Sequence, residues 1–253
     1  MTVLKKLSNS RQEELEWEAR VDLAAAFQLT YQFGWNRGIG NHYSLMVPNS
    51  DDTFFVNARG LLFSEITASN LIRCDFKGNV LEGKGEIRDV TYNIHVPIHR
   101  DHPSAKAVLH VHPPNITAIS LLENGRIALA HHNNLIFNDR VAYDDEMTGP
   151  ALELDEGNRI ARGLGDKTIM VMANHGVTVV GPTVHDAFSE LGICENTCGD
   201  QLRAMWTGLK LREQPAHLKW DHKGPFGDRI DAKLSFDAHV RQLERDVGTS
   251  YKT

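Results

Sequence analysis

The stretch Ala107-Val108-Leu109-His110-Val111-His112-Pro113-Pro114 reads as a short buried strand that ends at two prolines. Side chains alternate between the two faces of a strand, so His110 and His112 point one way while Leu109 and Val111 point into the opposite layer. The stretch therefore predicts a strand between two layers of the protein, with two imidazoles converging at its end.

Two imidazoles placed in this way suit a divalent metal ion, which histidine nitrogens bind at about 2.0–2.1 Å. A hydrogen-bonded, partly buried pair of histidines is the alternative explanation. A third ligand would come from elsewhere in the chain, and His175 is the candidate. It lies at a turn between two apolar strands and precedes Gly176, whose backbone can adopt dihedral angles closed to other residues. Taken alone, His175 also fits an ordinary solvated loop. Three histidines with one open coordination position would form a catalytic site that polarises a carbonyl or stabilises an enolate.

The rest of the chain alternates between helical and strand patterns. A proline at position 97 lies inside one of the predicted helices, where it costs about 3 kcal/mol. The tail contains Pro215, Gly224, Pro225 and Gly227, which predict a looping arm before a last helix. Together, these patterns predict an α/β domain with many short strands. Helices are predicted at 11–33, 89–99, 115–122, 155–164, 183–206 and 231–246, and strands at 43–47, 53–57, 71–75, 107–112, 168–172 and 177–180.

Composition sets the class of protein. The chain has 253 residues, of which 24% are charged and 41% hydrophobic, as in an ordinary folded protein of one large or two small domains. The net charge is −6 and no run is rich in lysine or arginine, which argues against nucleic acid or an anionic membrane as a partner. Histidine is abundant, with 13 residues.

Three cysteines, too few for a disulfide framework, predict a reducing compartment. The N-terminus runs into charge instead of the apolar stretch of a secretory signal, and no run of about 18 apolar residues predicts a membrane helix. The expected location is the cytoplasm.

Other catalytic patterns are incomplete. His95 and His99 would share a helix face, but Val96 stands where the H-E-x-x-H metalloprotease motif has its glutamate. No G-x-G-x-x-G, Walker or G-x-S-x-G pattern is present. Cys194 and Cys198 lie on one predicted helix face and are expected to pack in the interior.

Several motifs, in order over roughly residues 15–210, resemble the class II aldolase/adducin family, especially its adducin-head-like branch. The family implies a three-layer α/β/α sandwich around a mainly antiparallel sheet, usually a homotetramer with sites at subunit interfaces and a small-molecule substrate. It also implies one divalent metal ion per subunit on His110, His112 and His175, with zinc expected first and manganese, iron or cobalt as alternatives. The domain would span 1–210, and the 211–253 extension would serve subunit contacts. The motifs are Gly40-Asn41-His42-Tyr43-Ser44, the stretch 60–69, His102-Pro103 leading to His112, Val141-Ala142-Tyr143 with Gly149, and Asn174-His175-Gly176.

Two departures from the family concern proton transfer. The Ser-Ser-Glu segment of the sugar-phosphate aldolases falls on Asp89-Val90-Thr91, so the family glutamate is missing and Asp89 would repel a phosphate. The family tyrosine that donates a proton across the interface falls on His132. Either Glu86 or His132 would then carry the proton, or the reaction would need less proton transfer. The substrate-binding positions are predicted as Gly40, Asn41, Gly60 and Thr91, with the loop at Gly40 and Asn41 holding the far end of the substrate.

The resemblance implies a divalent-metal-dependent carbon–carbon lyase that acts by retro-aldol cleavage or decarboxylation, through a metal-bound enolate. The expected substrate is a small, non-phosphorylated keto or hydroxy-keto acid. A non-haem iron oxygenase on the same fold is one alternative, although the usual iron triad includes a carboxylate. A non-catalytic scaffold, as in adducin heads, is another, and the retention of all three histidines argues against it.

Overall fold

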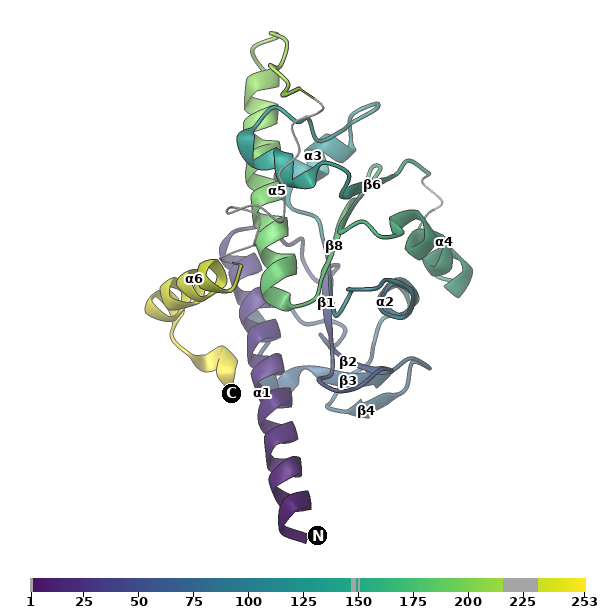
Figure 1. The fold of residues 1–253 in the computed structure, drawn as a ribbon, viewed down its shortest axis with the longest axis vertical. Coiled ribbons are helices and arrows are strands. Elements are labelled where there is room, and N and C mark those ends of the chain that lie inside the picture. The colour runs from purple at the N-terminus through teal and green to yellow at the C-terminus, as the bar shows by residue number, and fades with distance from the viewer. Residues whose placement is uncertain (1, 147–148, 150, 216–231) are drawn as a thin grey trace.

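One eight-stranded sheet organises the protein (Figure 1). This computed structural model describes residues 2–146, 149, 151–215 and 232–253. The strands lie in the order β4-β3-β2-β1-β5-β8-β7-β6, and every neighbouring pair is antiparallel except β6 and β7, which are parallel. The strands are β1 (His42–Met46), β2 (Thr53–Val56), β3 (Ile72–Asp75), β4 (Val80–Glu82), β5 (Ala107–Val111), β6 (Val141–Asp144), β7 (Ile169–Met172) and β8 (Gly176–Gly181).

Helices cover both faces of this sheet, which confirms the predicted three-layer α/β/α sandwich. Figure 1 shows α1 (Thr2–Gln32) and α5 (Val184–Met205) on one side, with α6 (Ala232–Val247) outside them. The other side carries α2 (Asp89–Asp101) and α4 (Leu154–Leu164), while α3 (Pro114–Ser120) follows the end of β5. Four short 3-10 helices complete the described elements, at Phe63–Glu65, Ala68–Asn70, His132–Phe137 and Ser250–Lys252.

Strand β5 divides its side chains between the two layers as its sequence predicts. Leu109 and Val111 belong to the hydrophobic core shared with α1 and α5. Val108 belongs to the second core, shared with α2 and α4. Because side chains alternate along a strand, His110 faces the α2 layer. The buried histidines of β1 and α2 described below lie on that face.

Two strands and part of one helix differ from the sequence-based prediction. The short β4, whose three residues are all exposed, and the parallel β6 lie at the two edges of the sheet and have weak strand patterns. Helix α1 begins at Thr2, nine residues before the predicted start. Its first part extends beyond the sheet (Figure 1).

The proline at position 97 lies inside α2, which continues to Asp101. Pro97 has no N–H, so the carbonyl of Asn93, four residues earlier, loses its helical partner. At this point α4 passes very close, because a Cβ atom at Gly157 would meet the Asn93 carbonyl oxygen at 1.6 Å. The contact between α2 and α4 thus depends on a glycine in one helix and accommodates a proline in the other.

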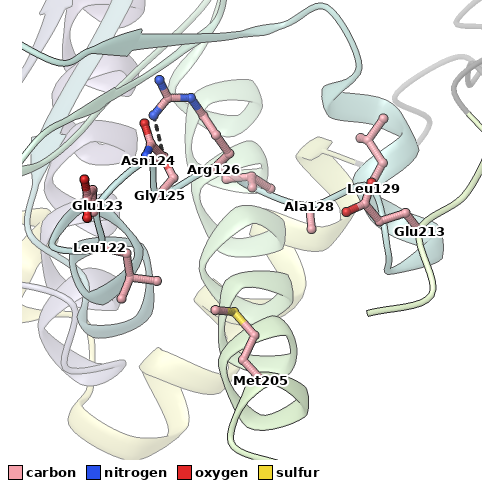
Figure 2. A pocket seen from close by; sticks show the side chains of 10 residues that line it. Leu122, Glu123, Asn124, Gly125, Arg126, Ala128, Leu129, Met205 and Glu213 are labelled. Carbon is pink, nitrogen blue, oxygen red and sulfur yellow. Dashed lines mark hydrogen bonds between the residues drawn. The ribbon is translucent and has the colours of Figure 1, made fainter. Parts of the chain in front are cut away.

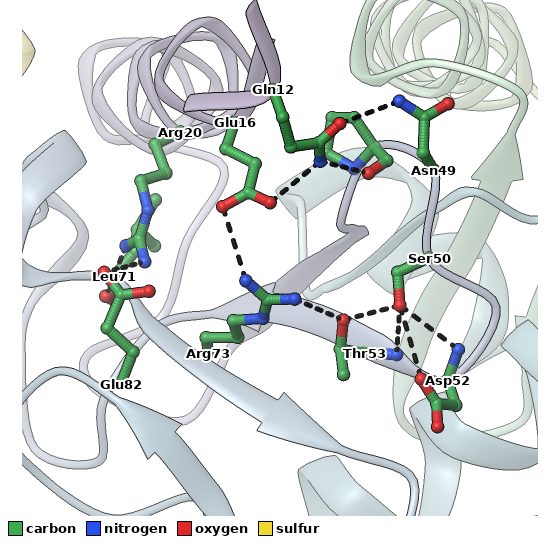
Figure 3. Close-up of polar contacts among 11 residues, drawn as sticks. Gln12, Glu16, Arg20, Asn49, Ser50, Asp52, Thr53, Leu71, Arg73 and Glu82 are labelled. Atoms are coloured by element: carbon green, nitrogen blue, oxygen red, sulfur yellow. Dashed lines mark hydrogen bonds and ion pairs between the residues drawn. The ribbon is translucent and has the colours of Figure 1, made fainter. Parts of the chain in front are cut away.

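Charged side chains fasten α1 to the β2–β4 end of the sheet (Figure 3). Arg20 donates to the carbonyl of Leu71 at 2.7 Å and pairs with Glu82 at 2.8 Å. Glu16 pairs with Arg73 at 3.3 Å. These contacts hold α1 against the half of the sheet that is formed by β4, β3, β2 and β1.

The C-terminal extension packs on its own chain. Phe236 of α6 contacts Phe188 and His185 of α5, with ring centroids 5.4 and 4.8 Å apart, and Leu243 is buried in the same core. The predicted arm falls mostly on residues 216–231, outside the described residues, and its role in subunit contacts stays a prediction. Within the described part of the chain, no helix is both long and apolar enough to cross a membrane.

Candidate metal centre

Three histidines from two parts of the chain meet at the carboxyl end of the central strand β5. His110 is on β5, His112 follows its end, and His175 lies in the turn between β7 and β8. One ligand nitrogen from each lies within 4.8 Å of the others, and the Nε2 atoms of His110 and His112 are 3.3 Å apart. The fold therefore brings the three predicted metal ligands together.

The donor set fits a divalent ion. Nitrogens that bind a tetrahedral ion at about 2.0–2.1 Å lie about 3.3–3.4 Å from one another, which is the spacing of His110 and His112. Burial lowers the pKa of His112 to about 4 and holds the pKa of His110 well below its usual value. Burial also lowers the pKa of His175, against the opposing charge of Asp144. The three rings are thus neutral near pH 7, which is the form that binds metal.

The hydroxyl of Thr178 orients one of these rings. Thr178 is the direct partner of His110 across β5 and β8, and its Oγ1 lies 3.0 Å from Nδ1 of His110. Because Nδ1 is engaged, Nε2 of His110 is the atom presented to the cluster. A hydrogen-bond partner at the ring nitrogen that does not face the metal fixes the orientation of a metal-binding histidine and raises its affinity for the metal.

The turn that carries His175 is built differently from the sequence-based expectation. The residue with a left-handed backbone is Asn174, with φ of 56°, and Gly176 has no positive φ. Gly176 is required for a steric reason, since a Cβ there would lie 2.4 Å from Cδ2 of His112 and 2.7 Å from the carbonyl oxygen of Val111. The missing side chain makes room for a ligand ring.

The chain after His112 is held by a buried carboxylate. Glu195 of α5 accepts hydrogen bonds from the backbone N–H groups of Asn115 and Ile116, both at 2.9 Å, at the first turn of α3. Burial raises the pKa of Glu195, and these hydrogen bonds oppose that rise. Glu195 therefore fixes the start of α3, two to four residues beyond His112.

A second group of buried histidines lies behind the cluster, and sequence reasoning gave it no role. The His42 ring stacks on His110, with centroids 4.8 Å apart and planes at 22°. His95 and His99 share a face of α2 as expected and are buried against β1. The sequence does hint at this second group, through the alternation of His42 with Ser44 and the four-residue spacing of His95 and His99. Only the strand register, however, brings these side chains to His110.

The predicted substrate-binding residues lie in different environments. Asn41, 1% exposed, accepts a hydrogen bond from the backbone N–H of Arg37 at 2.6 Å, and its Nδ2 has no partner among the described residues. Thr91 is buried on α2, one turn before His95. Gly40 is half-buried beside Asn41, whereas Gly60 is exposed with φ of 93°. Asn41 offers the clearest unused donor, next in sequence to His42.

The two predicted proton-transfer residues are on the surface of the single chain. Glu86 is exposed between β4 and α2, and its carbonyl accepts a hydrogen bond from the backbone N–H of Arg59. His132 is exposed at the first position of the His132–Phe137 3-10 helix. Neither belongs to the histidine cluster formed by the described residues of one chain.

Two arginines bring positive charge to the cluster. The charge of Arg37 contributes to lowering the pKa of His112, and that of Arg88 contributes to lowering the pKa of His42. Arg88 donates to the carbonyl of Ile39 at 3.2 Å, in the loop that carries Arg37. Neither arginine is in an ion pair within the described ranges. The surroundings of the cluster thus attract anions.

A separate hollow lies elsewhere on the chain. It has a volume of about 360 Å³ and runs along the loop after α3, between Leu122 and Leu129 and the end of α5 (Figure 2). Arg126 in this loop pairs with Asp145 and covers the ring of Tyr143. The hollow contains none of the histidines, so we take the histidine cluster as the candidate site.

Comparison with known proteins concerns the family and the fold of the chain. The family model "Class II Aldolase and Adducin N-terminal domain" matches residues 21–202. A "Putative aldolase class 2 protein" of Caulobacter vibrioides is 36% identical over 92% of this chain and 91% of its own length. Rat alpha-adducin is 29% identical over 74% of this chain, which corresponds to only 25% of the adducin.

Solved structures show the same fold. An aldolase II superfamily protein from Pseudomonas syringae superposes with a TM-score of 0.84 at 35% identity, covering 94% of this chain and 96% of that one. The L-fuculose 1-phosphate aldolase of Glaciozyma antarctica superposes with a TM-score of 0.83 at 22% identity, covering 96% and 94%. At that identity the second likeness concerns the fold alone.

Proposed function

Because the chain belongs to the class II aldolase and adducin family, we propose that it is a divalent-metal-dependent carbon–carbon lyase for a small keto or hydroxy-keto acid. The single observation that carries this proposal is the cluster of His110, His112 and His175, three neutral imidazoles at the spacing a metal ion requires. A divalent ion bound there supplies a Lewis acid for a carbonyl group. Zinc is the first expectation for three nitrogen ligands.

The charges around the cluster support an acidic substrate. Arg37 and Arg88 bring positive charge to the cluster and form no ion pair among the described residues, although the charge of Arg37 also acts on Glu195. Asn41 adds a buried amide donor without a partner. We expect the substrate carboxylate to bind on this side, oriented by one arginine and by the Nδ2 group of Asn41.

A sugar phosphate is the less favourable substrate. Asp89 is exposed at the first turn of α2, two residues before Thr91, and its charge would repel a phosphate dianion. Thr91, buried at the position where the sugar-phosphate aldolases are expected to have glutamate, has no titratable group to move a proton.

Proton transfer then needs another residue. We assign it to His132 of an adjacent subunit in a homotetramer, with Glu86 as the second candidate. The exposure of both side chains is compatible with a role across a subunit interface. Within one chain, the residues at the cluster bind and orient the substrate, while the exposed donor would complete the site from a neighbour.

The test is a substrate screen with purified, zinc-loaded protein. Keto acids and hydroxy-keto acids are supplied without oxygen, and release of pyruvate, aldehyde or carbon dioxide is measured. Metal-dependent release from at least one acid, lost in His112→Ala, is the expected result. Metal binding without any turnover would contradict the proposal.

A non-catalytic binding role is the second candidate, because adducins are among the relatives. In such a protein the three histidines need not bind metal. Turnover that stops on chelation and returns with zinc would exclude it, and turnover only in the presence of oxygen would point to iron oxygenase chemistry instead.

A further inference from the structure

A continuous chain of hydrogen bonds runs from the cluster into the α2 layer. Nδ1 of His42 lies 2.7 Å from Nε2 of His95, and Nδ1 of His95 lies 2.5 Å from Oγ of Ser44. Oγ of Ser44 lies 2.7 Å from Nε2 of His99, and Nδ1 of His99 lies 2.7 Å from the carbonyl oxygen of Ala105. All four side chains are buried.

The backbone carbonyl at the far end gives this chain one direction. A carbonyl oxygen only accepts, so the proton of His99 is on Nδ1. Burial lowers the pKa of His99 to about 4, so the ring is neutral near pH 7 and its Nε2 can only accept. The hydroxyl of Ser44 must then donate to His99.

The same reasoning passes to the next ring. Because its hydrogen is used toward His99, Oγ of Ser44 accepts from Nδ1–H of His95. A neutral His95 has its other nitrogen unprotonated, so Nε2 of His95 accepts from Nδ1–H of His42. The reverse direction would place two acceptors, His99 Nδ1 and the Ala105 carbonyl, against each other at 2.7 Å.

The end of the chain lies at the metal centre. His42 is the direct partner of His110 across β1 and β5, and its ring is stacked on that of His110. Its Nε2 makes no hydrogen bond with the described residues. It is also not one of the buried polar atoms that lack a hydrogen-bond partner, so it is not fully enclosed by the protein.

We infer that the chain from the Ala105 carbonyl through His99, Ser44 and His95 positions His42 in a single tautomer, with its proton on Nδ1 and a bare Nε2 beside the cluster. That atom is a hydrogen-bond acceptor for the hydroxyl group of a ligand bound at His110, His112 and His175. The orientation of a hydroxyl is what a hydroxy-keto acid needs before cleavage, since the carbon that bears it becomes the aldehyde. The second part of the inference rests on the proposed function; the tautomer does not.

Ser44 is the position at which to test the chain. It is a positioning residue two hydrogen bonds from His42, and it does not touch the triad. Ser44→Ala removes the only link between His95 and His99 and leaves the Nδ1–H of His95 without its acceptor. Ser120→Ala is the matched control, because the Ser120 hydroxyl is also buried but donates only to the carbonyl of Thr117.

The measurement is nitrogen-15 NMR of the histidine rings in the full-length protein, without metal and with one equivalent of zinc. In the metal-free wild type, His42, His95 and His99 should each have a protonated Nδ1 and an unprotonated Nε2, although free imidazole side chains in water favour the opposite tautomer. Ser44→Ala should give His42 a mixture of tautomers, while Ser120→Ala leaves its signals unchanged. A melting curve for each variant checks that it is folded.

Three results would overturn the inference. The first two are a proton on Nε2 of His42 in the wild type and a His42 tautomer that is unchanged in folded Ser44→Ala. The third is a zinc-induced shift at Nε2 of His42 as large as the shifts of His110, His112 and His175, which would make His42 a fourth ligand. Absence of the tautomer pattern from a wild-type protein that binds zinc rejects this inference alone. An intact pattern in a protein that binds no zinc rejects the proposed function instead.

Discussion

The ring of His112 fills the space that a side chain at Gly176 would need: a Cβ atom on residue 176 would lie 2.4 Å from Cδ2 of His112. The main chain of Val111 closes the other side, with its carbonyl oxygen 2.7 Å from the same point. The ring of His112 is the part that can move, and moving it breaks the spacing to His110.

Gly176→Ala should therefore weaken metal binding without unfolding the protein. We expect zinc affinity to fall about 10–100-fold, as for other changes that misplace a ligand, in a competition titration with a chromogenic chelator. Gly163→Ala is the control, because a Cβ there meets only the flexible end of Met170 at 3.2 Å. Equal affinities for the two variants would show that residue 176 does not set the position of His112.

Removal of the hydroxyl of Thr178 tests the orientation of His110. Thr178→Val keeps the shape of the side chain but loses the contact to Nδ1, so zinc affinity should fall by about one order of magnitude. Thr178→Ser should restore most of it, because it retains the oxygen. If valine and serine bind zinc alike in the same titration, the hydroxyl is not needed.

Glu195 contributes to stability through the start of α3. Glu195→Ala leaves the backbone N–H groups of part-buried Asn115 and buried Ile116 without their acceptor, and hydrogen bonds to a charged group contribute about 1.5–3 kcal/mol each. We expect the free energy of unfolding in urea to fall by about 3 kcal/mol, and that of Glu195→Gln to fall less. A loss under about 1 kcal/mol for the alanine variant would contradict this role.

The buried histidines predict a loss of stability in mild acid. The pKa of His99 is about 4 in the folded protein, below its ordinary value of about 6.5. Between these values the unfolded chain binds more protons, so stability rises with pH and is lost as pH falls from 6.5 to 4. One such group accounts for about 3 kcal/mol.

Urea unfolding of metal-free protein at pH 7, 6, 5 and 4 measures this dependence. The slope of the free energy of unfolding against pH gives the number of protons taken up on unfolding. His99→Asn should reduce that number by up to one. An unchanged slope in the variant would mean that His99 is protonated in the folded protein, and would remove the basis for its neutral form.

Much of the site could be predicted from short patterns. Alternation along β5 placed His110 and His112 on one face, and the prolines after them marked the end of the strand. The predicted helix end at residue 164 and helix start at residue 183 also agree with the structure: Gly165 follows α4 with φ of 58°, and Thr183 before α5 accepts from the N–H of Asp186. Such features depend on the chemistry of a few neighbouring residues.

Strand register could not be predicted in this way. His42 and Thr178 flank His110 because β1 and β8 pair with β5 at one register, and that register depends on contacts between segments 68 residues apart in the chain. The steric role of Gly176 and the hydrogen-bond chain behind His42 follow from the same pairing. Sequence patterns identified the three candidate ligands, whereas the groups that orient them depend on tertiary structure.

The central claim is that His110, His112 and His175 hold one divalent ion. Its most direct test is the metal content, by mass spectrometry, of wild-type protein and of His110→Ala, both purified, incubated with zinc and passed through a desalting column. The account predicts about one zinc per chain in the wild type and a loss of at least nine-tenths of it in the folded variant. Stoichiometric zinc in a fully folded His110→Ala would contradict it.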